Sequence, residues 1–253
     1  MIIINADDWG ASRDATDAAF ECFKAGRLAS VTAMVFMRDA ERAAEIARDT
    51  ALDVGLHINL DEPFADGRCL QEVVAAHARI GRFLRWHKYA QVLYNPWLRS
   101  DFRRVYEAQV TEFQRLYGRA PSHFDGHHHL HLCSNMMMDN VIPRGQIVRR
   151  SFSFSPGQKS WVNRCYRHYV DFQLGQRFRL TDYFFALSRY LEPRQFETIA
   201  ALARMGTVEL MTHPERRAEF DWLMSDNYLK STLGLQVGSF TALATCPGSA
   251  GRG

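Results

Sequence analysis

Short apolar segments alternate with segments of helical period along most of the chain. Residues 1–5 are isoleucine-rich and continuously apolar until Asn5, as in a strand buried on both faces, and residues 12–23 then repeat apolar side chains at helical spacing. Further strands are expected at 30–37, 52–60, 123–131, 146–150 and 207–212, and further helices at 39–48 and 100–117. This alternation predicts an α/β fold with mainly parallel strands, either open or closed into a barrel.

Chemically reactive side chains fall at the predicted carboxyl ends of four of these strands. They are Asp7 and Asp8, His57, the histidine-rich segment 123–131, and His213. The carboxyl ends of parallel strands share one face of the fold, which is where active sites are built. The topology therefore predicts that these groups, distant in sequence, converge on one site.

Segment 123–131, HFDGHHHLH, holds five histidines and one aspartate in nine residues. In an extended strand one face would carry His123, Asp125, His127, His129 and His131. So many partly buried bases need a cation or hydrogen-bond partners. Mixed imidazole and carboxylate ligands suit zinc and other transition metals, whereas magnesium prefers oxygen. We expect one divalent ion, zinc or magnesium first, with manganese, cobalt or nickel as alternatives.

Adjacent carboxylates on a strand face opposite ways, but at a strand end the chain bends and both can turn toward one site. Asp7 and Asp8 could then divide two tasks, one binding the metal and the other accepting a proton from bound water. The alternative is a helix N-cap beside a surface acid. His213, which precedes Pro214, can donate a proton to a leaving amine or alkoxide, or can simply cap a strand end.

The segment 79–104 alternates basic with aromatic residues, among them Arg82, Arg85 and Trp86. The first interpretation is an amphipathic helix with a solvated basic face. A lid over an anionic or sugar substrate, or a peripheral contact with a membrane surface, are the alternatives. The net charge of +3 is too small to indicate a nucleic-acid partner, and none is expected.

With 253 residues, 47% of them hydrophobic, the chain suits one large domain. We expect the domain over residues 1–244 and a disordered tail at 245–253, which is rich in small, polar and helix-breaking residues. The five cysteines are widely spaced without a C-x-x-C pair, so neither disulfides nor a thiolate zinc site is expected. The sequence shows neither the pattern of a signal peptide at its start nor an apolar run long enough to span a membrane, so we expect the protein in the cytoplasm.

Four motifs, in this order, resemble those of the YdjC-like carbohydrate deacetylases, the family that includes chitooligosaccharide deacetylases and the hopanoid-biosynthesis-associated HpnK proteins. They are NADDWG at 5–10, GLH at 55–57, the segment 123–131, and MTHP at 211–214. The resemblance extends from residue 1 to about residue 224. It implies an irregular TIM-like barrel in a single domain, and dimers are common among such relatives, which makes a homodimer an option.

The resemblance also implies roles for individual residues. Asp8, His57 and His127 would hold the metal, Asp7 would be the base that activates metal-bound water, and His213 would be the acid that protonates the leaving amine. Residues expected to support these groups or to contact substrate are Trp9, Asp125, His129, His131, Arg149 and Arg150. Among these, Asp125 could orient an imidazole, and Arg149 or Arg150 could hold Asp7.

The implied activity is removal of acetyl from an N-acetylated amino sugar in an oligosaccharide, a glycolipid or a lipid-linked precursor. Two alternatives stay open, namely a metal-dependent amidohydrolase or esterase acting on a non-sugar compound, and a non-catalytic sugar-binding barrel. The chain departs from the family pattern at Trp9, where phenylalanine is usual, and at Glu215, where glycine is usual. Segment 136–185 matches no motif of the family. These departures bear on the substrate more than on the chemistry.

Overall fold

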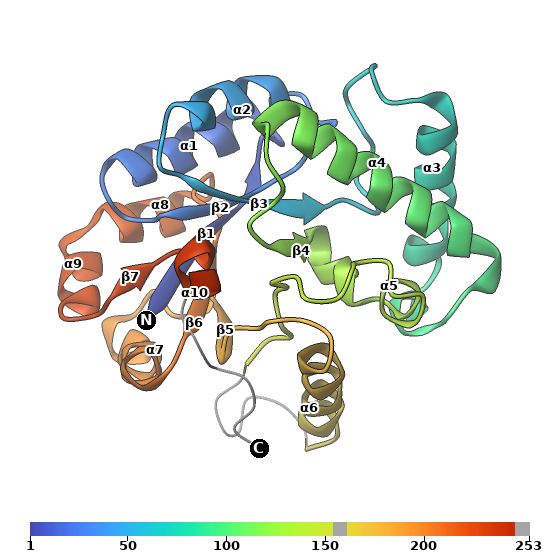
Figure 1. Cartoon of the computed structure of the whole chain (residues 1–253). Coiled ribbons are helices and arrows are strands. Elements are labelled where there is room, and N and C mark those ends of the chain that lie inside the picture. The colour runs from blue at the N-terminus through green and yellow to red at the C-terminus, as the bar shows by residue number, and fades with distance from the viewer. Residues whose placement is uncertain (154–160, 246–253) are drawn as a thin grey trace.

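The computed structural model describes residues 1–153 and 161–245. Its strands are all parallel and lie in the order β4-β3-β2-β1-β6-β5, with β7 paired to the start of β1. They are β1 (Ile2–Trp9), β2 (Ser30–Ala33), β3 (Asp53–Ile58), β4 (Phe124–Gly126), β5 (Tyr183–Ala186), β6 (Val208–Thr212) and β7 (Val237–Gly238). The sheet curves into a half-barrel (Figure 1). The predicted α/β fold with parallel strands in an irregular barrel is confirmed.

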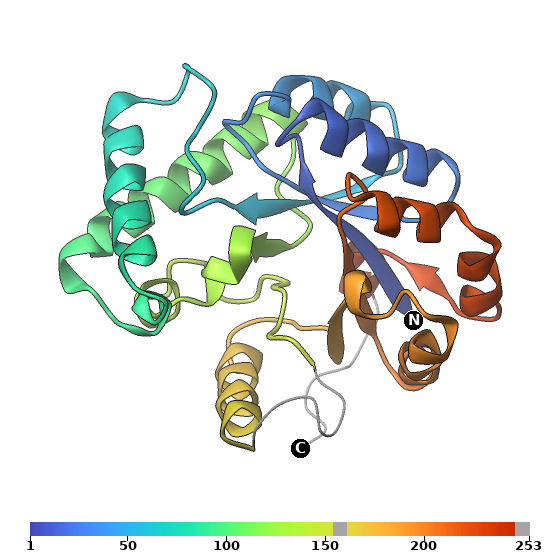
Figure 2. The same ribbon diagram turned by 180° about the vertical axis from the view of Figure 1, so that it is seen from behind.

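Helices surround this half-barrel, and Figure 2 shows α3 and α4 side by side beyond β3 and β4. The α-helices are α1 (Arg13–Lys24), α2 (Ala40–Arg48), α3 (Gln71–Trp86), α4 (Arg99–Tyr117), α5 (Ser134–Met138), α6 (Trp161–Gly175), α7 (Pro193–Met205), α8 (Arg217–Met224), α9 (Asp226–Thr232) and α10 (Phe240–Thr245). Single 3-10 segments are η1 (Ala90–Val92), η2 (Pro96–Leu98), η3 (His127–Leu132) and η4 (Leu187–Arg189). None of these described helices has the length and apolar character needed to cross a membrane.

Local sequence signals set the ends of the first and the longest helix. Ser12 caps α1, because its hydroxyl accepts a hydrogen bond from the backbone N–H of Ala15 at 3.2 Å. Gly118 ends α4 in the left-handed conformation, with a φ of 65°, which costs glycine nothing sterically. Both signals can be read from the sequence.

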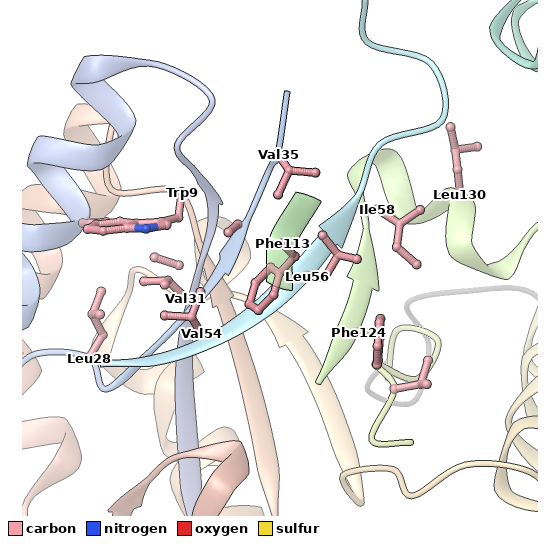
Figure 3. Close-up of a cluster of buried hydrophobic side chains, with 14 of the residues drawn as sticks. Trp9, Leu28, Val31, Val35, Val54, Leu56, Ile58, Phe113, Phe124 and Leu130 are labelled. Carbon is pink, nitrogen blue, oxygen red and sulfur yellow. The ribbon is translucent and has the colours of Figure 1, made fainter. Parts of the chain in front are cut away.

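The hydrophobic core lies between the sheet and the outer helices. Figure 3 shows Trp9, Val31, Val54 and Phe113 packed together there, and each is buried. Burying one such side chain contributes about 1.5–3 kcal/mol. The opposite, concave face of the sheet carries polar and charged side chains among apolar ones, and the candidate site is built there.

The prediction of one strand over 123–131 is wrong. Only Phe124–Gly126 pairs as β4, and the chain then turns into η3, because His128 and His129 take left-handed backbone with φ of 52° and 58°. Gly126 permits this turn, since a Cβ there would lie 2.9 Å from the backbone nitrogen of His131. The alternation of side chains between two faces therefore stops at Gly126.

Other segments also differ from expectation. Residues 146–150 form only isolated bridges, Phe124 with Val148 and Ile147 with Arg179, and β5 was not foreseen. Segment 79–104 is the end of α3, η1, η2 and the start of α4 rather than one helix. The predicted disordered tail lies outside the described residues, apart from Thr245 at the end of α10.

Candidate metal centre

β1 brings two adjacent carboxylates to one end of the sheet. Asp8 has a φ of 62°, and the pairing of β1 with β2 shifts in register between Ala6 and Trp9. Aspartate adopts left-handed backbone more readily than most residues. The turn directs the Asp8 carboxylate to the concave face that Asp7 already faces, so both acids reach one site.

Asp8, His57 and His127 each offer a ligand atom, and these three atoms lie within 4.8 Å of one another. Asp8 Oδ1 is 3.3 Å from His57 Nε2 and 3.1 Å from His127 Nδ1. One carboxylate oxygen and two imidazole nitrogens suit zinc and related transition metals, and they leave positions for water. The donor set therefore fits a divalent metal ion.

The electrostatics of Asp8 favour the ionised form that a metal requires. Burial acts to raise the pKa of Asp8, but hydrogen bonds from His127 and His57 outweigh it and hold the pKa well below its usual range. The side chains of Asp8 and His127 are 17% and 16% exposed, so these two ligands are open to solvent, whereas His57 is buried.

Asp125 fixes the orientation of His57. Its Oδ1 lies 2.7 Å from His57 Nδ1, and both side chains are buried. Because an ionised carboxylate only accepts, Nδ1 carries the hydrogen and Nε2 is left free to bind a metal. Burial acts to lower the pKa of His57, but the charge of Asp125 outweighs it and raises that pKa, so metal binding must displace a proton from this ring.

Arg149 holds Asp7 in a two-pronged contact. Its Nη1 and Nη2 donate to Asp7 Oδ2 and Oδ1, each at 2.7 Å, and neither side chain is more than 3% exposed. Burial acts to raise the pKa of Asp7, but the positive charge of Arg149 lowers it, so Asp7 stays a carboxylate. Of the two arginines named from the sequence, Arg149 is the one that contacts Asp7.

His213 lies beside the cluster at the end of β6. Its Nε2 is 3.8 Å from Asp8 Oδ2, on the carboxylate oxygen that does not face His57 and His127. The backbone N–H of His213 donates to Glu219 Oε2 at 2.8 Å, and Thr212 donates to the same oxygen at 2.9 Å. Glu219 thereby anchors the start of the loop that presents the imidazole.

His129 and His131 of segment 123–131 do not join the cluster. His131 is buried, and its Nε2 lies 3.1 Å from the carbonyl oxygen of Arg149, while burial lowers its pKa to about 4. The ring of His129 packs edge-on against Phe152 and Phe184, and burial lowers its pKa to about 3. Both imidazoles are therefore neutral groups near the site, and their expected contact with substrate stays a prediction.

Two other predicted residues lie away from the metal ligands. Trp9 is fully buried in the core under the outer helices (Figure 3), because the side chain next to Asp8 points to the convex face. Arg150 pairs with Asp171 of α6 at 2.6 Å and donates to the carbonyl oxygens of Thr181 and Asp182. The structure does not bring Trp9 into contact with the site.

A second group of potential ligands overlaps the first. Asp61, His127 and His128 also lie within 4.8 Å of one another, and Asp61 Oδ2 is 3.0 Å from His128 Nδ1. The His128 side chain is 63% exposed, so this group is the more solvated of the two. Water satisfies such exposed groups without a metal.

The sequence interpretation missed two residues of the concave face. The Thr32 hydroxyl lies 3.1 Å from Asp125 Oδ2 and 3.4 Å from Asp7 Oδ1, so it links the two carboxylates. Glu209 accepts a hydrogen bond from Arg149 Nε at 2.6 Å and is fully buried. A glutamate inside the apolar run of β6 was the available signal for it.

Comparison with known proteins places this site in a family. The model of the YdjC-like protein family matches residues 1–232. A carbohydrate deacetylase of Mus musculus is 33% identical over 132 residues, covering 52% of this chain and 43% of that protein. A chitooligosaccharide deacetylase of Serratia marcescens is 32% identical over 133 residues, covering 52% of this chain and 51% of that protein. The matched segment thus spans about half the length of these relatives.

Two longer matches cover most of the chain. A chitooligosaccharide deacetylase of Yersinia enterocolitica is 29% identical over 225 residues, covering 85% of this chain and 81% of that protein. The crystal structure of a putative cellobiose-phosphate cleavage protein from Enterococcus faecalis superposes with a TM-score of 0.66 over 96% of this chain and 98% of that one, at 19% identity, which supports the fold alone. From the family match over most of its length, together with the converging acids and histidines, we conclude that the chain belongs to the YdjC-like protein family.

Proposed function

We propose that this protein is a metal-dependent deacetylase that removes the acetyl group from an N-acetylated amino sugar. The observation that carries the proposal is the cluster of Asp8, His57 and His127, with Asp7 close to His57 and His213 close to Asp8. The names of the deacetylase relatives support the substrate class.

Asp8 Oδ1, His57 Nε2 and His127 Nδ1 would hold the metal. A divalent ion there supplies a water of lowered pKa and positive charge for the oxygen of the amide carbonyl. Two nitrogen ligands and one oxygen ligand favour zinc, with manganese, cobalt, nickel and magnesium as the ions to compare.

The protein's own side chains then move two protons. Asp7, kept ionised by Arg149, accepts the proton that water loses as its oxygen bonds to the amide carbon. His213 in its protonated form donates to the nitrogen as the carbon–nitrogen bond breaks, so acetate and a free amine leave. The distance of 3.8 Å between His213 Nε2 and Asp8 Oδ2 supports this role for His213.

We propose that the rest of the substrate occupies a cavity of about 800 Å³, which none of the proposed metal ligands lines but which reaches Asp61, whose carboxylate lies within 4.8 Å of His127. Asp61, Phe64, Arg82 and Trp86 are among the residues that line it. Since Asp61 also contacts His128, the cavity begins next to the histidine segment. We propose that segment 79–104 forms one wall of the substrate site; peripheral membrane contact through it, and a homodimer, stay predictions.

The test is acetate release from a panel of N-acetylated oligosaccharides and glycolipids, before and after chelation and metal add-back. Wild type, Asp7→Asn and His127→Ala are compared, with His128→Ala as the matched control in the same turn. We expect metal-dependent release that both Asp7→Asn and His127→Ala abolish, whereas only His127→Ala abolishes metal binding.

Other results would select the alternatives. Metal-dependent hydrolysis of non-sugar amides or esters, with none of the sugars, would make the protein an amidohydrolase or esterase. Sugar binding without any acetate release would indicate a non-catalytic barrel. Release that survives chelation and His127→Ala would overturn the assignment of the metal ligands.

A further inference from the structure

Glu209 is a buried carboxyl group to which the proposed mechanism gives no task. It lies on β6 with no exposed surface, and its Oε1 accepts a hydrogen bond from Arg149 Nε at 2.6 Å. Its other oxygen, Oε2, is buried and has no hydrogen-bond partner among the described residues. A fully ionised carboxylate rarely leaves a buried oxygen without a donor, because desolvation of that charge is not repaid.

The guanidinium of Arg149 faces three carboxyl groups at once. It contacts Asp7 from β1, Asp125 from β4 and Glu209 from β6 at 2.6–2.7 Å, and all four side chains are at most 3% exposed. One positive charge cannot balance three negative charges in such a place. A proton on one of the three reduces the excess from two negative charges to one.

The distribution of donors identifies the group that carries this proton. Asp7 receives hydrogen bonds from two nitrogens of Arg149 and from Asn5, whereas Asp125 receives them from His57 and Thr32 and forms an ion pair with Arg149. Glu209 receives one. The carboxyl group with the fewest hydrogen-bond donors loses the least stabilisation when a proton neutralises it.

A neighbouring acceptor points the same way. In the parallel pairing of β1 with β6, Ile3 lies opposite Glu209, so Asn5, two residues further along β1, faces the same side of the sheet. Asn5 Nδ2 donates to Asp7, but its Oδ1 is buried without a donor. Two buried oxygens on this face, Asn5 Oδ1 and Glu209 Oε2, therefore have no hydrogen-bond donor in the part of the chain that the structure describes. A hydrogen on Glu209 Oε2 would turn one of these two acceptors into a donor.

We propose that Glu209 is a positioning residue that acts as a neutral carboxylic acid. Its Oε1 holds Arg149 by Nε, so that Nη1 and Nη2 of the guanidinium are turned toward Asp7 and Asp125. Because the proton on Oε2 neutralises Glu209, the positive charge of Arg149 stabilises the negative charges of Asp7 and Asp125 alone. The charged groups that face Glu209 are Arg149, Asp125 and Asp7, and burial raises the pKa of Glu209 to about 7 even against Arg149.

The first experiment reads the proton directly and needs no substrate. Infrared spectra of the metal-loaded wild type and of Glu209→Gln are compared at about pH 6, below the raised pKa. We expect the carbonyl stretch of a buried carboxylic acid in the wild type and its loss in Glu209→Gln. The matched control is Glu219→Gln, because Glu219 is also buried and also has one oxygen without a hydrogen bond from the described residues, Oε1, but its Oε2 accepts two hydrogen bonds and Oε1 lies 3.7 Å from Arg216 Nη1. Absence of that band in the wild type would overturn the proposal.

The second experiment tests the positioning and rests on the proposed deacetylase activity. Glu209→Leu, which cannot accept from Arg149, should lower kcat about 100-fold with KM little changed, the size expected when a proton-transfer group is displaced. Glu209→Gln keeps a neutral acceptor and should restore most of kcat and the wild-type pH profile. A glutamine variant as slow as the leucine variant would show that a charge is needed. If no protein releases acetate, the infrared result still decides the state of Glu209.

Discussion

His57 Nδ1 lies 2.7 Å from Asp125 Oδ1, while Nε2 of the same ring lies 3.3 Å from Asp8 Oδ1. One imidazole thus joins the buried charge network of Arg149 to the candidate metal ligands. Because Arg149 also holds Asp7, the proposed base and the proposed ligand are positioned by the same set of contacts. The contacts of the proposed base and of the proposed metal ligands are therefore connected. The variants below test individual residues of this network and of the core.

Replacing Asp125 with Ala should weaken metal binding without removing a ligand. Without the carboxylate, the tautomer and orientation of His57 are no longer fixed, and loss of such a partner typically costs about 10–100-fold in metal affinity. Competition titration with a chromophoric chelator measures the effect. Asp53→Ala, which removes a buried aspartate paired with Thr241 at the far end of β3, is the control. Equal zinc affinities for the two variants would mean that Asp125 does not orient the ligand.

His213→Gln should slow amide cleavage and leave metal affinity unchanged. The variant cannot protonate the leaving nitrogen, and a lost general acid costs about 10²–10⁴-fold in rate. An aryl ester, whose leaving group needs no proton, should lose much less. His128→Gln, a change in a side chain that is 63% exposed, serves as control. Equal losses on amide and ester would exclude His213 as the acid.

Trp9→Ala should destabilise the fold rather than alter the chemistry. Trp9 is fully buried in the core, and removing such a side chain costs about 3–5 kcal/mol. Urea unfolding measures this cost, with Trp9→Phe as the milder change. Zinc affinity of the folded variants should match the wild type. If Trp9→Phe raised KM without loss of stability, Trp9 would be a substrate contact after all.

Acid should destabilise the protein partly through His77 of α3. Burial lowers the pKa of His77 to about 4, so between roughly pH 6.5 and 4 the unfolded chain binds a proton that the folded one does not. Stability is therefore lost as the pH falls through this window, by at most about 1.4 kcal/mol per pH unit for one group. Urea unfolding of the wild type and His77→Gln from pH 7 to 4.5 should show a shallower decline in the variant. Parallel curves would contradict the buried, neutral state of His77.

Several features of the site follow from the sequence because they depend on local patterns. The isoleucine run that ends in Asp7 and Asp8 marks the carboxyl end of β1, and the apolar run before His213 marks that of β6. Parallel strands then bring these ends together, which requires only the strand and helix alternation. Hydrophobic period and helix caps are properties of a few neighbouring residues, so they can be read without the fold.

Only the tertiary structure decided which side chains within each motif meet. The left-handed backbone at Asp8, His128 and His129 breaks the two-residue alternation on which strand predictions depend. Side chains of the site also meet across long stretches of sequence, such as Arg149 with Asp7 across 142 positions and His127 with Asp8 across 119. Periodicity carries no information about such pairs. It therefore located the acids and histidines at one edge of the sheet, whereas packing of distant segments brings His127, the histidine that the family resemblance implied, next to Asp8 and buries Trp9 in the core.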